Sequence, residues 1–280
     1  GGEGTLELDG QSALLAREAT SGQRPGAFGC MLLDGNSTLD ALFQLVGDRG
    51  VIDVRAGSTL RAGFDAFGGI LLFDGGLLTG DGLIDATVVN FGDLEPRSPA
   101  IGAAAARGGS PSVLTIDGNY FQLGQVPTQG EASGTLSITS PDQTLAVLGE
   151  ASLGGGLIVD LDFMPTEKDL AGLTVVDATG GVSDRFDVAS FPSLDAPTKF
   201  LRLNYTAPRG PGAGGTVSLL VDTLGATVDL NDPTAAATID TPVAAVLADV
   251  DGANGLDLVV AEPDPLGPTG SPGSVFILHY

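Results

Sequence analysis

The sequence predicts an all-β protein in which short strands stack on one another as a β-solenoid. The chain of 280 residues contains 43 Gly and 17 Pro. Inside a helix these residues are ~1 and ~3 kcal/mol less favourable than Ala, whereas both are common in turns. Apolar runs of four to six residues alternate with Gly or Asp, and runs this short need a neighbour to bury one face. A β-sandwich with Greek-key connections is the alternative.

The first predicted strands lie between residues 5 and 90. They are residues 5–9, 31–34, 50–54, 58–62, 69–74 and 82–90. Two further segments, 12–20 (SALLAREAT) and 38–45 (TLDALFQL), have Leu at helical spacing. We expect short helices or irregular strands there.

The rest of the chain divides by composition. Residues 97–111 are rich in small residues, Gly and Pro, which predicts a protruding loop. Residues 134–222 contain the clearest strand patterns, such as GTLSITS, QTLAVLG and GTVSLLVD. We therefore expect one β domain over residues 1–222, a linker over 223–242, and a different module over 243–280.

The charge of the chain limits its partners. Asp and Glu number 35 against 12 Lys and Arg, which gives a formal net charge of −23. Such a surface repels phosphate backbones, so nucleic acid is not an expected partner, whereas divalent cations are natural counter-ions. No apolar run approaches the ~18 residues of a membrane span. The single cysteine, Cys30, allows no intramolecular disulfide and is expected to pack as a small apolar side chain.

Residues 68–222 carry a series of motifs that resembles the end of an autotransporter passenger domain, or an autotransporter-associated β-strand protein. The motifs are LTGDGLIDATVVNFGDLEP, SPSVLTIDGNYFQ, SGTLSITS, QTLAVLGEASLGGGLIVDL and GLTVVDATGGVSDRFD. The resemblance implies a right-handed parallel β-helix on an exported protein, with adhesive or scaffold duties and no catalytic residues. The chain departs from the family at the 97–111 insertion and at Asp184-Arg185, where the family has Gly.

Residues 243–280 resemble one blade of an FG-GAP, integrin-type β-propeller. They read VAAVLADVDGANGLDLVVAEPDP and, after a Gly/Pro loop, GSVFILHY. In that family a strand leads into an Asp-rich loop and a second strand follows it. The resemblance implies a partial blade, with the remaining blades of the propeller as its partners in a longer parent chain.

The Asp-rich loop of this blade is the predicted metal site. Calcium takes 6–8 oxygen ligands at about 2.3–2.6 Å. Asp249, Asp251 and Asp257 stand at loop positions one, three and nine, and Asn254 can add an oxygen. Position five holds Ala253 in place of a carboxylate or amide, so we expect weak Ca²⁺ binding. The alternative is an Asp/Gly turn without an ion.

These features favour a non-catalytic exported protein with a structural or adhesive role, located outside the cell or on its surface. The export signal is expected upstream of residue 1, and the expected ligands are cell-surface or polysaccharide molecules.

Two other function classes stay open. One is a polysaccharide-acting β-helix enzyme, a lyase or a hydrolase, which would need carboxylates beside basic residues. The arginines form no recognisable set for this purpose: Arg55, Arg61, Arg97 and Arg107. The other is a carbohydrate-binding β module, in which aromatic side chains stack on sugars, although core packing is the simpler role for them: Tyr120, Phe121, Phe200 and Tyr205. Asp74, Asp81 and Asp85 are interpreted as turn residues.

Overall fold

The computed structural model describes residues 3–21, 28–47, 49–63, 69–97, 112–124, 133–161, 165–166, 170, 172–192, 194, 199–206, 214–223, 244–248, 257–262 and 274–278. Every element defined in these ranges is a β-strand, which confirms the all-β prediction. The chain divides into two compact units, Gly1–Thr223 and Leu224–Tyr280. Within the described ranges there is no helix long and apolar enough to cross a membrane.

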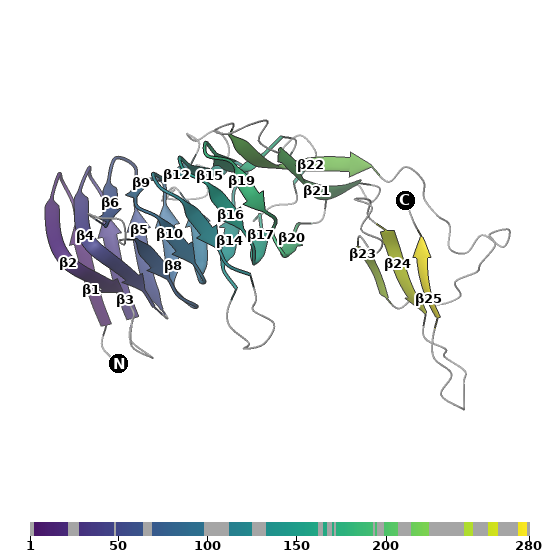
Figure 1. Cartoon of the computed structure of the whole chain (residues 1–280), viewed down its shortest axis with the longest axis horizontal. Coiled ribbons are helices and arrows are strands. Elements are labelled where there is room, and N and C mark those ends of the chain that lie inside the picture. The colour runs from purple at the N-terminus through teal and green to yellow at the C-terminus, as the bar shows by residue number, and fades with distance from the viewer. Residues whose placement is uncertain are drawn as a thin grey trace, which may run out of the picture. The chain divides into compact units, whose positions relative to one another are not determined.

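The first unit contains two sheets (Figure 1). Sheet A is formed by β1 (Glu3–Leu8), β3 (Phe28–Leu33), β5 (Gly50–Val54), β8 (Leu77–Gly80), β11 (Asp93–Pro96), β14 (Thr135–Ile138), β17 (Gly156–Val159) and β20 (Val188–Ser190). Sheet B is formed by β2 (Ala13–Ser21), β4 (Thr38–Val46), β6 (Thr59–Ala62), β7 (Ile70–Leu72), β9 (Leu83–Asp85), β10 (Val88–Asn90), β12 (Ser112–Ile116), β13 (Tyr120–Gln122), β15 (Gln143–Val147), β16 (Ala151–Leu153), β18 (Thr174–Ala178), β19 (Val182–Asp184), β21 (Lys199–Thr206) and β22 (Gly215–Thr223).

The strands of both sheets follow one repeating order, which we call a rung: one strand of sheet A, then one long strand or two short strands of sheet B. In sheet A every strand pairs in parallel with the strand of the next rung. The long strand β4 pairs with both β6 and β7, so its two halves continue as two separate strands. The shortest rung contains β8, β9 and β10, and register pairs Leu77 with Asp93, 16 residues later.

The interior is filled by aliphatic side chains at alternate strand positions. On sheet A the fully buried residues include Leu33, Val54 and Leu78, and on sheet B Leu39 pairs with Leu60, which pairs with Ile84. Alternation places every second side chain inside, and each fully buried Leu or Ile contributes about 1.5–3 kcal/mol. In-register stacking therefore turns a short apolar run into part of a continuous core.

The two ends of this stack are built differently. At the C-terminal end β22 pairs antiparallel with β18, and β21 pairs antiparallel with β22. This hairpin adds Leu201, Val217 and Leu219 to the core, with Phe186 and Phe191 packed against it. At the N-terminal end Leu6, Leu8 and Leu14 are only partly buried, since β1 and β2 each have one described neighbour.

Several sequence predictions can be compared with these strands. Residues 50–54 form β5 as predicted, and the run 82–90 forms β9 and β10 with a break at Ala86 and Thr87. The helical interpretation of 12–20 and 38–45 is wrong, because these segments form most of β2 and β4, paired in parallel from Ala13–Thr38 to Ser21–Val46. The predicted loop at 97–111 lies outside the described residues beyond Arg97.

The described strands of the second unit form an antiparallel sheet of their own. β23 (Ala244–Ala248) pairs with β24 (Asp257–Glu262), which pairs with β25 (Ser274–Leu278). A strand thus precedes the Asp-rich loop and another follows it, as the sequence predicts.

Candidate functional site

The predicted calcium ligands lie mostly outside the described residues. Asp249, Asp251 and Asn254 belong to the undescribed segment between β23 and β24. Asp257 is the first residue of β24, where its backbone pairs with Ala248, but its side chain is not described. Calcium binding therefore stays a prediction. Among the described residues, no group of three His, Cys, Asp or Glu side chains is arranged to hold a metal ion.

The corner between sheets A and B repeats a four-residue turn in the first three rungs. The turns are Asp9-Gly10-Gln11-Ser12, Asp34-Gly35-Asn36-Ser37 and Arg55-Ala56-Gly57-Ser58. Gly35 and Asn36 have φ of 63° and 66°, a left-handed region that Gly and Asn tolerate best. The turn residues Asp9, Asp34, Arg55 and Asp81 continue the register of sheet A, and we call them the corner ladder.

Arg55 is the centre of the corner ladder. Its Nη1 lies 2.6 Å from Asp34 Oδ2, and its Nε donates to Asp53 Oδ2 at 3.1 Å. On the other side, the amide of Ala56 donates to Asp81 Oδ1 at 2.7 Å. One guanidinium is thus shared by two carboxylates, and a third carboxylate is held by the adjacent backbone.

The two carboxylates that share Arg55 differ in their pKa. The hydrogen bond from Arg55, with one from the Gly35 amide, lowers the pKa of Asp34. Burial raises the pKa of Asp53, and the opposing hydrogen bond from Arg55 does not cancel this effect. Asp53 is therefore the more easily protonated of the two.

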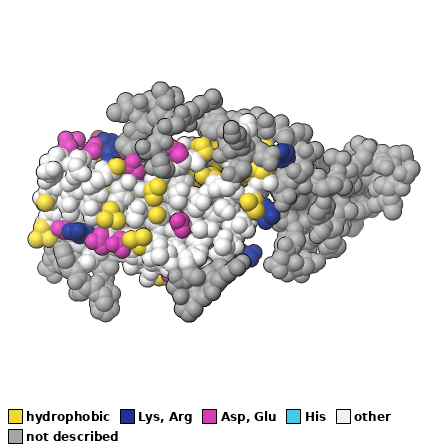
Figure 2. All heavy atoms as spheres, turned by 90° about the horizontal axis from the view of Figure 1, so that it is seen from above, with side chains coloured by type: hydrophobic (Ala, Val, Ile, Leu, Met, Phe, Trp, Pro, Cys, Tyr) yellow, Lys and Arg dark blue, Asp and Glu magenta, His cyan; other side chains and the backbone are white. Residues whose placement is uncertain are grey.

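A second charged row lies on the outer face of sheet B. Register pairs Asp40 with Arg61 and Arg61 with Asp85. Arg61 Nε donates to Asp85 Oδ2 at 3.0 Å, and its Nη1 lies 3.7 Å from Asp40 Oδ1. Figure 2 shows acidic and basic side chains lying next to one another over the N-terminal strands. Together with the corner ladder and Asp53, this row makes up what we call the charged face.

The outer face of sheet A continues this polar surface. Register places Thr79 between Asp53 and Glu95. Thr79 Oγ1 is buried and has no hydrogen-bond partner in the described structure. Glu95 accepts a hydrogen bond from Thr139 Oγ1 at 2.8 Å. Burial, followed by the charge of Asp74, raises the pKa of the neighbouring Asp93.

These contacts define the chemistry of the charged face. A general acid needs a carboxyl with a raised pKa, and Asp53 has one. Arg55 and Arg61 belong to the same rung, but each already bridges carboxylates of this chain. Arg97 Nη1 lies 3.9 Å from Glu95 Oε2, and Arg107 falls outside the described residues.

The aromatic side chains considered for sugar stacking have different positions. Tyr120 is fully buried, so it is a core residue, and Phe121 is partly exposed. Tyr205 lies under the Arg185 guanidinium, 5.3 Å from ring centroid to Cζ, and its hydroxyl accepts a hydrogen bond from the Phe186 amide. The side chain of Phe200 is not described.

Tyr120 belongs to a buried group that we call the polar cluster: Asn90, Tyr120 and Gln122. Asn90 Nδ2 donates to Tyr120 Oη at 3.0 Å, and Tyr120 Oη donates to Gln122 Oε1 at 2.8 Å. Gln122 Nε2 contacts the carbonyls of Gly134, Gly154 and Gly156 at 3.0, 2.7 and 2.8 Å. The cluster contacts three backbone carbonyls from two segments, residue 134 before β14 and residues 154–156 from the end of β16 to the start of β17, which is a structural role.

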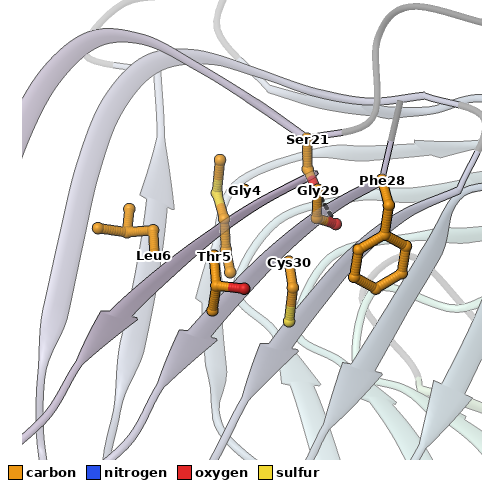
Figure 3. A pocket seen from close by; sticks show the side chains of 8 residues that line it. Gly4, Thr5, Leu6, Ser21, Phe28, Gly29 and Cys30 are labelled. Atoms are coloured by element: carbon orange, nitrogen blue, oxygen red, sulfur yellow. Dashed lines mark hydrogen bonds between the residues drawn. The ribbon is translucent and has the colours of Figure 1, made fainter. Parts of the chain in front are cut away.

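A cavity of about 350 Å³ opens at the N-terminal end of the stack. It is lined by residues of β1 and the start of β3, with Ser21 from the end of β2 (Figure 3). Ser21 Oγ donates to the Gly29 carbonyl at 2.6 Å. Cys30 borders the cavity and is only partly buried, and burial raises the pKa of its thiol, which does not favour a reactive thiolate.

Comparison with protein-family models, curated proteins and solved structures gave no match for this chain. The candidate site therefore rests on the geometry of the charged face. Sequence reasoning missed this face, although the Asp-Gly-x-Ser turn at residues 9–12 recurs 25 residues later at 34–37. That recurrence was the available signal.

Proposed function

We propose that the first unit is a right-handed parallel β-helix that serves as a non-catalytic structural or adhesive element outside the cell or on its surface. The observation that carries this proposal is the continuous parallel register of sheet A across eight strands. The only antiparallel pairs described in the first unit involve β22. A Greek-key sandwich would pair its strands antiparallel, so the register favours the β-helix.

The charged face supports a binding role for this element. Guanidinium groups between carboxylates hold the acidic side chains in fixed rows, on strands that are themselves rigidly stacked. A rigid, extended surface of this kind suits repeated weak contacts with a polysaccharide or cell surface. With a net charge of −23, such contacts with acidic polymers require bridging cations.

The proposal is tested by binding of the full chain to immobilised polysaccharides, with and without Ca²⁺. We expect retention on a polysaccharide surface, with no new reducing ends and no unsaturated products in the soluble fraction. Release of either product at a rate proportional to protein concentration would contradict the non-catalytic role.

The second candidate function is that of a polysaccharide-acting enzyme. Asp53 favours it, because a carboxyl with a raised pKa lies 3.1 Å from a guanidinium. If this function is correct, Asp53→Asn abolishes product release, while Asp85→Asn on the other charged row leaves it unchanged. Equal activity of both variants would exclude Asp53 as the general acid.

For the second unit we propose an FG-GAP-like blade with a weak Ca²⁺ site at Asp249, Asp251, Asn254 and Asp257. Its support is the ligand spacing and the β23–β24 pair that flanks the loop. Ca²⁺ is expected to raise the Tm of a chain that contains the complete propeller, and Asp251→Ala to abolish the rise. Asp264→Ala, outside the loop, is the matched control, and an unchanged response in Asp251→Ala removes the assignment.

A further inference from the structure

The outer face of β7, β10 and β13 carries large apolar side chains. The last residues of these strands, Leu72, Asn90 and Gln122, point into the stack and are at most 2 % exposed. Side chains alternate along a strand, so the residues on either side of each of these three point outward. We call the six outward residues the apolar ladder: Leu71, Phe73, Val89, Phe91, Phe121 and Leu123.

The apolar ladder is continuous along the stack. Register pairs Leu71 with Val89 and Val89 with Phe121, so these three residues form one column. The other three residues of the ladder directly follow the strands. They form a second column, because the amides of Phe91 and Leu123 continue the hydrogen bonding to the preceding rung at 2.8 and 3.1 Å.

The apolar ladder lies at the surface and is not part of the core. Phe73 is 39 % exposed and Leu123 is 38 % exposed, and the other four residues are partly exposed. Contiguous exposed apolar side chains are typical of binding surfaces. The ladder is therefore a candidate site on a different surface from the charged face.

A column of polar residues runs beside the ladder on the same face. Thr87 and Asn119 precede the inward residues Val88 and Tyr120, so they point outward in the rungs of β10 and β13. Asn119 Oδ1 accepts a hydrogen bond from the Glu150 amide of the next rung at 2.9 Å, which fixes the orientation of its carboxamide. The face thus offers hydrogen-bonding groups on one side and apolar groups on the other.

The size and the charge of this face indicate which ligand fits. A stable protein interface takes about 20–30 residues a side, whereas the ladder consists of six. The exposed residues Asp74 and Glu150 at its borders are acidic, which disfavours an anionic polymer.

A neutral sugar polymer matches the remaining features. A pyranose ring presents C–H groups on its faces and hydroxyl groups at its edge, as an apolar column beside a polar column requires. Neighbouring rungs are about 4.8 Å apart, which is close to the length of one sugar unit in an extended polysaccharide.

We propose that the apolar ladder binds a neutral polysaccharide, which lies along the stack with one sugar unit over each rung. Phe73 and Phe91 pack against the ring faces, and Thr87 and Asn119 bond to hydroxyl groups at the ring edge. This inference rests on the polysaccharide-binding role proposed above, but it assigns neutral polymers to a separate surface and needs no bridging cation.

The test is native affinity electrophoresis of the full chain, whose net charge of −23 drives migration. The gels contain hydroxyethyl cellulose, laminarin or soluble starch, all uncharged, together with EDTA. We expect at least one polymer to retard the chain. The double variant Phe73→Ala/Phe91→Ala should weaken this binding about tenfold or more, because two aromatic contacts are lost.

The matched control is Leu148→Ala/Ile158→Ala, which removes two apolar side chains that are 49 % and 42 % exposed on other parts of the surface. It should bind like the wild type. Absence of retardation by all three polymers, or equal losses in the two double variants, overturns the proposal. If the alanine pair does not fold, Phe73→Leu/Phe91→Leu keeps the apolar character but removes the rings. Full binding by that variant overturns the proposal as well.

Two further measurements separate this site from the other assignments. The Phe73→Ala/Phe91→Ala variant should keep the Ca²⁺-dependent retention on acidic polysaccharides that the charged face is proposed to give. Loss of that retention together with neutral binding would overturn a separate site. Concentration-dependent dimerisation in sedimentation velocity, abolished by the same variant, would assign the ladder to a second copy and overturn the proposal.

Discussion

The strands from β3 to β9 and the strands from β10 to β17 solve the same stacking problem in different ways. In the first group the interior is aliphatic, as at Leu39, Leu60 and Ile84, and the fixed polar contacts lie outside on the charged face. In the second group the polar cluster lies inside. Register pairs Leu72 with Asn90 and Asn90 with Gln122, so one interior column changes from apolar to polar between neighbouring rungs.

The difference shows that the interior has to supply hydrogen-bond partners for inward-facing backbone groups. In the first group, where the corners close with the four-residue turn, strand pairing satisfies the backbone. Around β13 and β14 the Gln122 amide nitrogen contacts the carbonyls of Gly134, Gly154 and Gly156, and Gly134 also accepts a hydrogen bond from the Gly156 amide. Buried polar groups must be paired, so the interior column becomes polar there.

The largest expected effect is that of Gln122→Leu. The substitution keeps the volume but removes the N–H donors that contact the Gly154 and Gly156 carbonyls and the acceptor of the Tyr120 hydroxyl, which should lower the free energy of unfolding by about 4 kcal/mol. Urea denaturation followed by circular dichroism measures it. A loss below about 1 kcal/mol would mean that the polar cluster is replaceable by an apolar column, and the comparison would fail.

Leu60→Ala tests the aliphatic group of rungs. Leu60 is fully buried between Leu39 and Ile84, so the cavity should cost about 3 kcal/mol. The same urea measurement applies, with Leu15→Ala as the matched control because that leucine is 74 % exposed. Similar losses in the two variants would show that Leu60 is not part of a close-packed core.

Tyr120→Phe separates the contribution of the Tyr120 hydroxyl from that of the Gln122 amide. It removes the hydroxyl that links Asn90 to Gln122 but leaves the bonds from Gln122 to the three carbonyls. We expect a loss of about 1.5 kcal/mol. A loss as large as that of Gln122→Leu would place the main contribution at the hydroxyl and not at the carbonyls.

Arg55→Gln should have the smallest effect, about 1 kcal/mol at neutral pH, because both partners of the Arg55–Asp34 pair are partly solvent-exposed. The Arg55 hydrogen bond lowers the pKa of Asp34, so the stabilisation is present above the unfolded pKa of about 4 and is lost as the pH falls through the lower folded pKa. The difference between wild type and variant in thermal unfolding should therefore shrink on acidification. A difference independent of pH would show that Arg55 acts through packing and not through charge.

The sequence was sufficient to predict many of the strands, because alternation and Gly or Asp punctuation are local signals, but β8 and β11 lie outside the predicted runs. β5 matches its prediction, whereas β2 and β4 were ambiguous because Leu spacing in SALLAREAT and TLDALFQL fits a helix as well as alternation. Pairing between the two segments resolves the ambiguity, and pairing is not visible in either segment alone.

The candidate site was harder to predict because it also depends on pairing between segments that are distant in the sequence. Arg55 contacts Asp34, 21 residues away, and Gln122 contacts the Gly156 carbonyl, 34 residues away. These contacts depend on the number of residues in each rung, which varies from rung to rung. One feature of the sequence does indicate how the rungs stack on one another: the corner turn that recurs in the first three rungs.

The 16-residue rung of β8, β9 and β10 makes the length of this protein adjustable in discrete steps. Excision of residues 77–92 would pair Asp93 with Val51 and Thr115 with Thr59. Asp93 and Val51 are the two partners of Leu77, and Thr115 and Thr59 are the two partners of Leu83. Every remaining side chain would keep its orientation. Loss of one residue within a strand would instead exchange inner and outer side chains, so lengthening or shortening by recombination is tolerated only in whole turns of the chain.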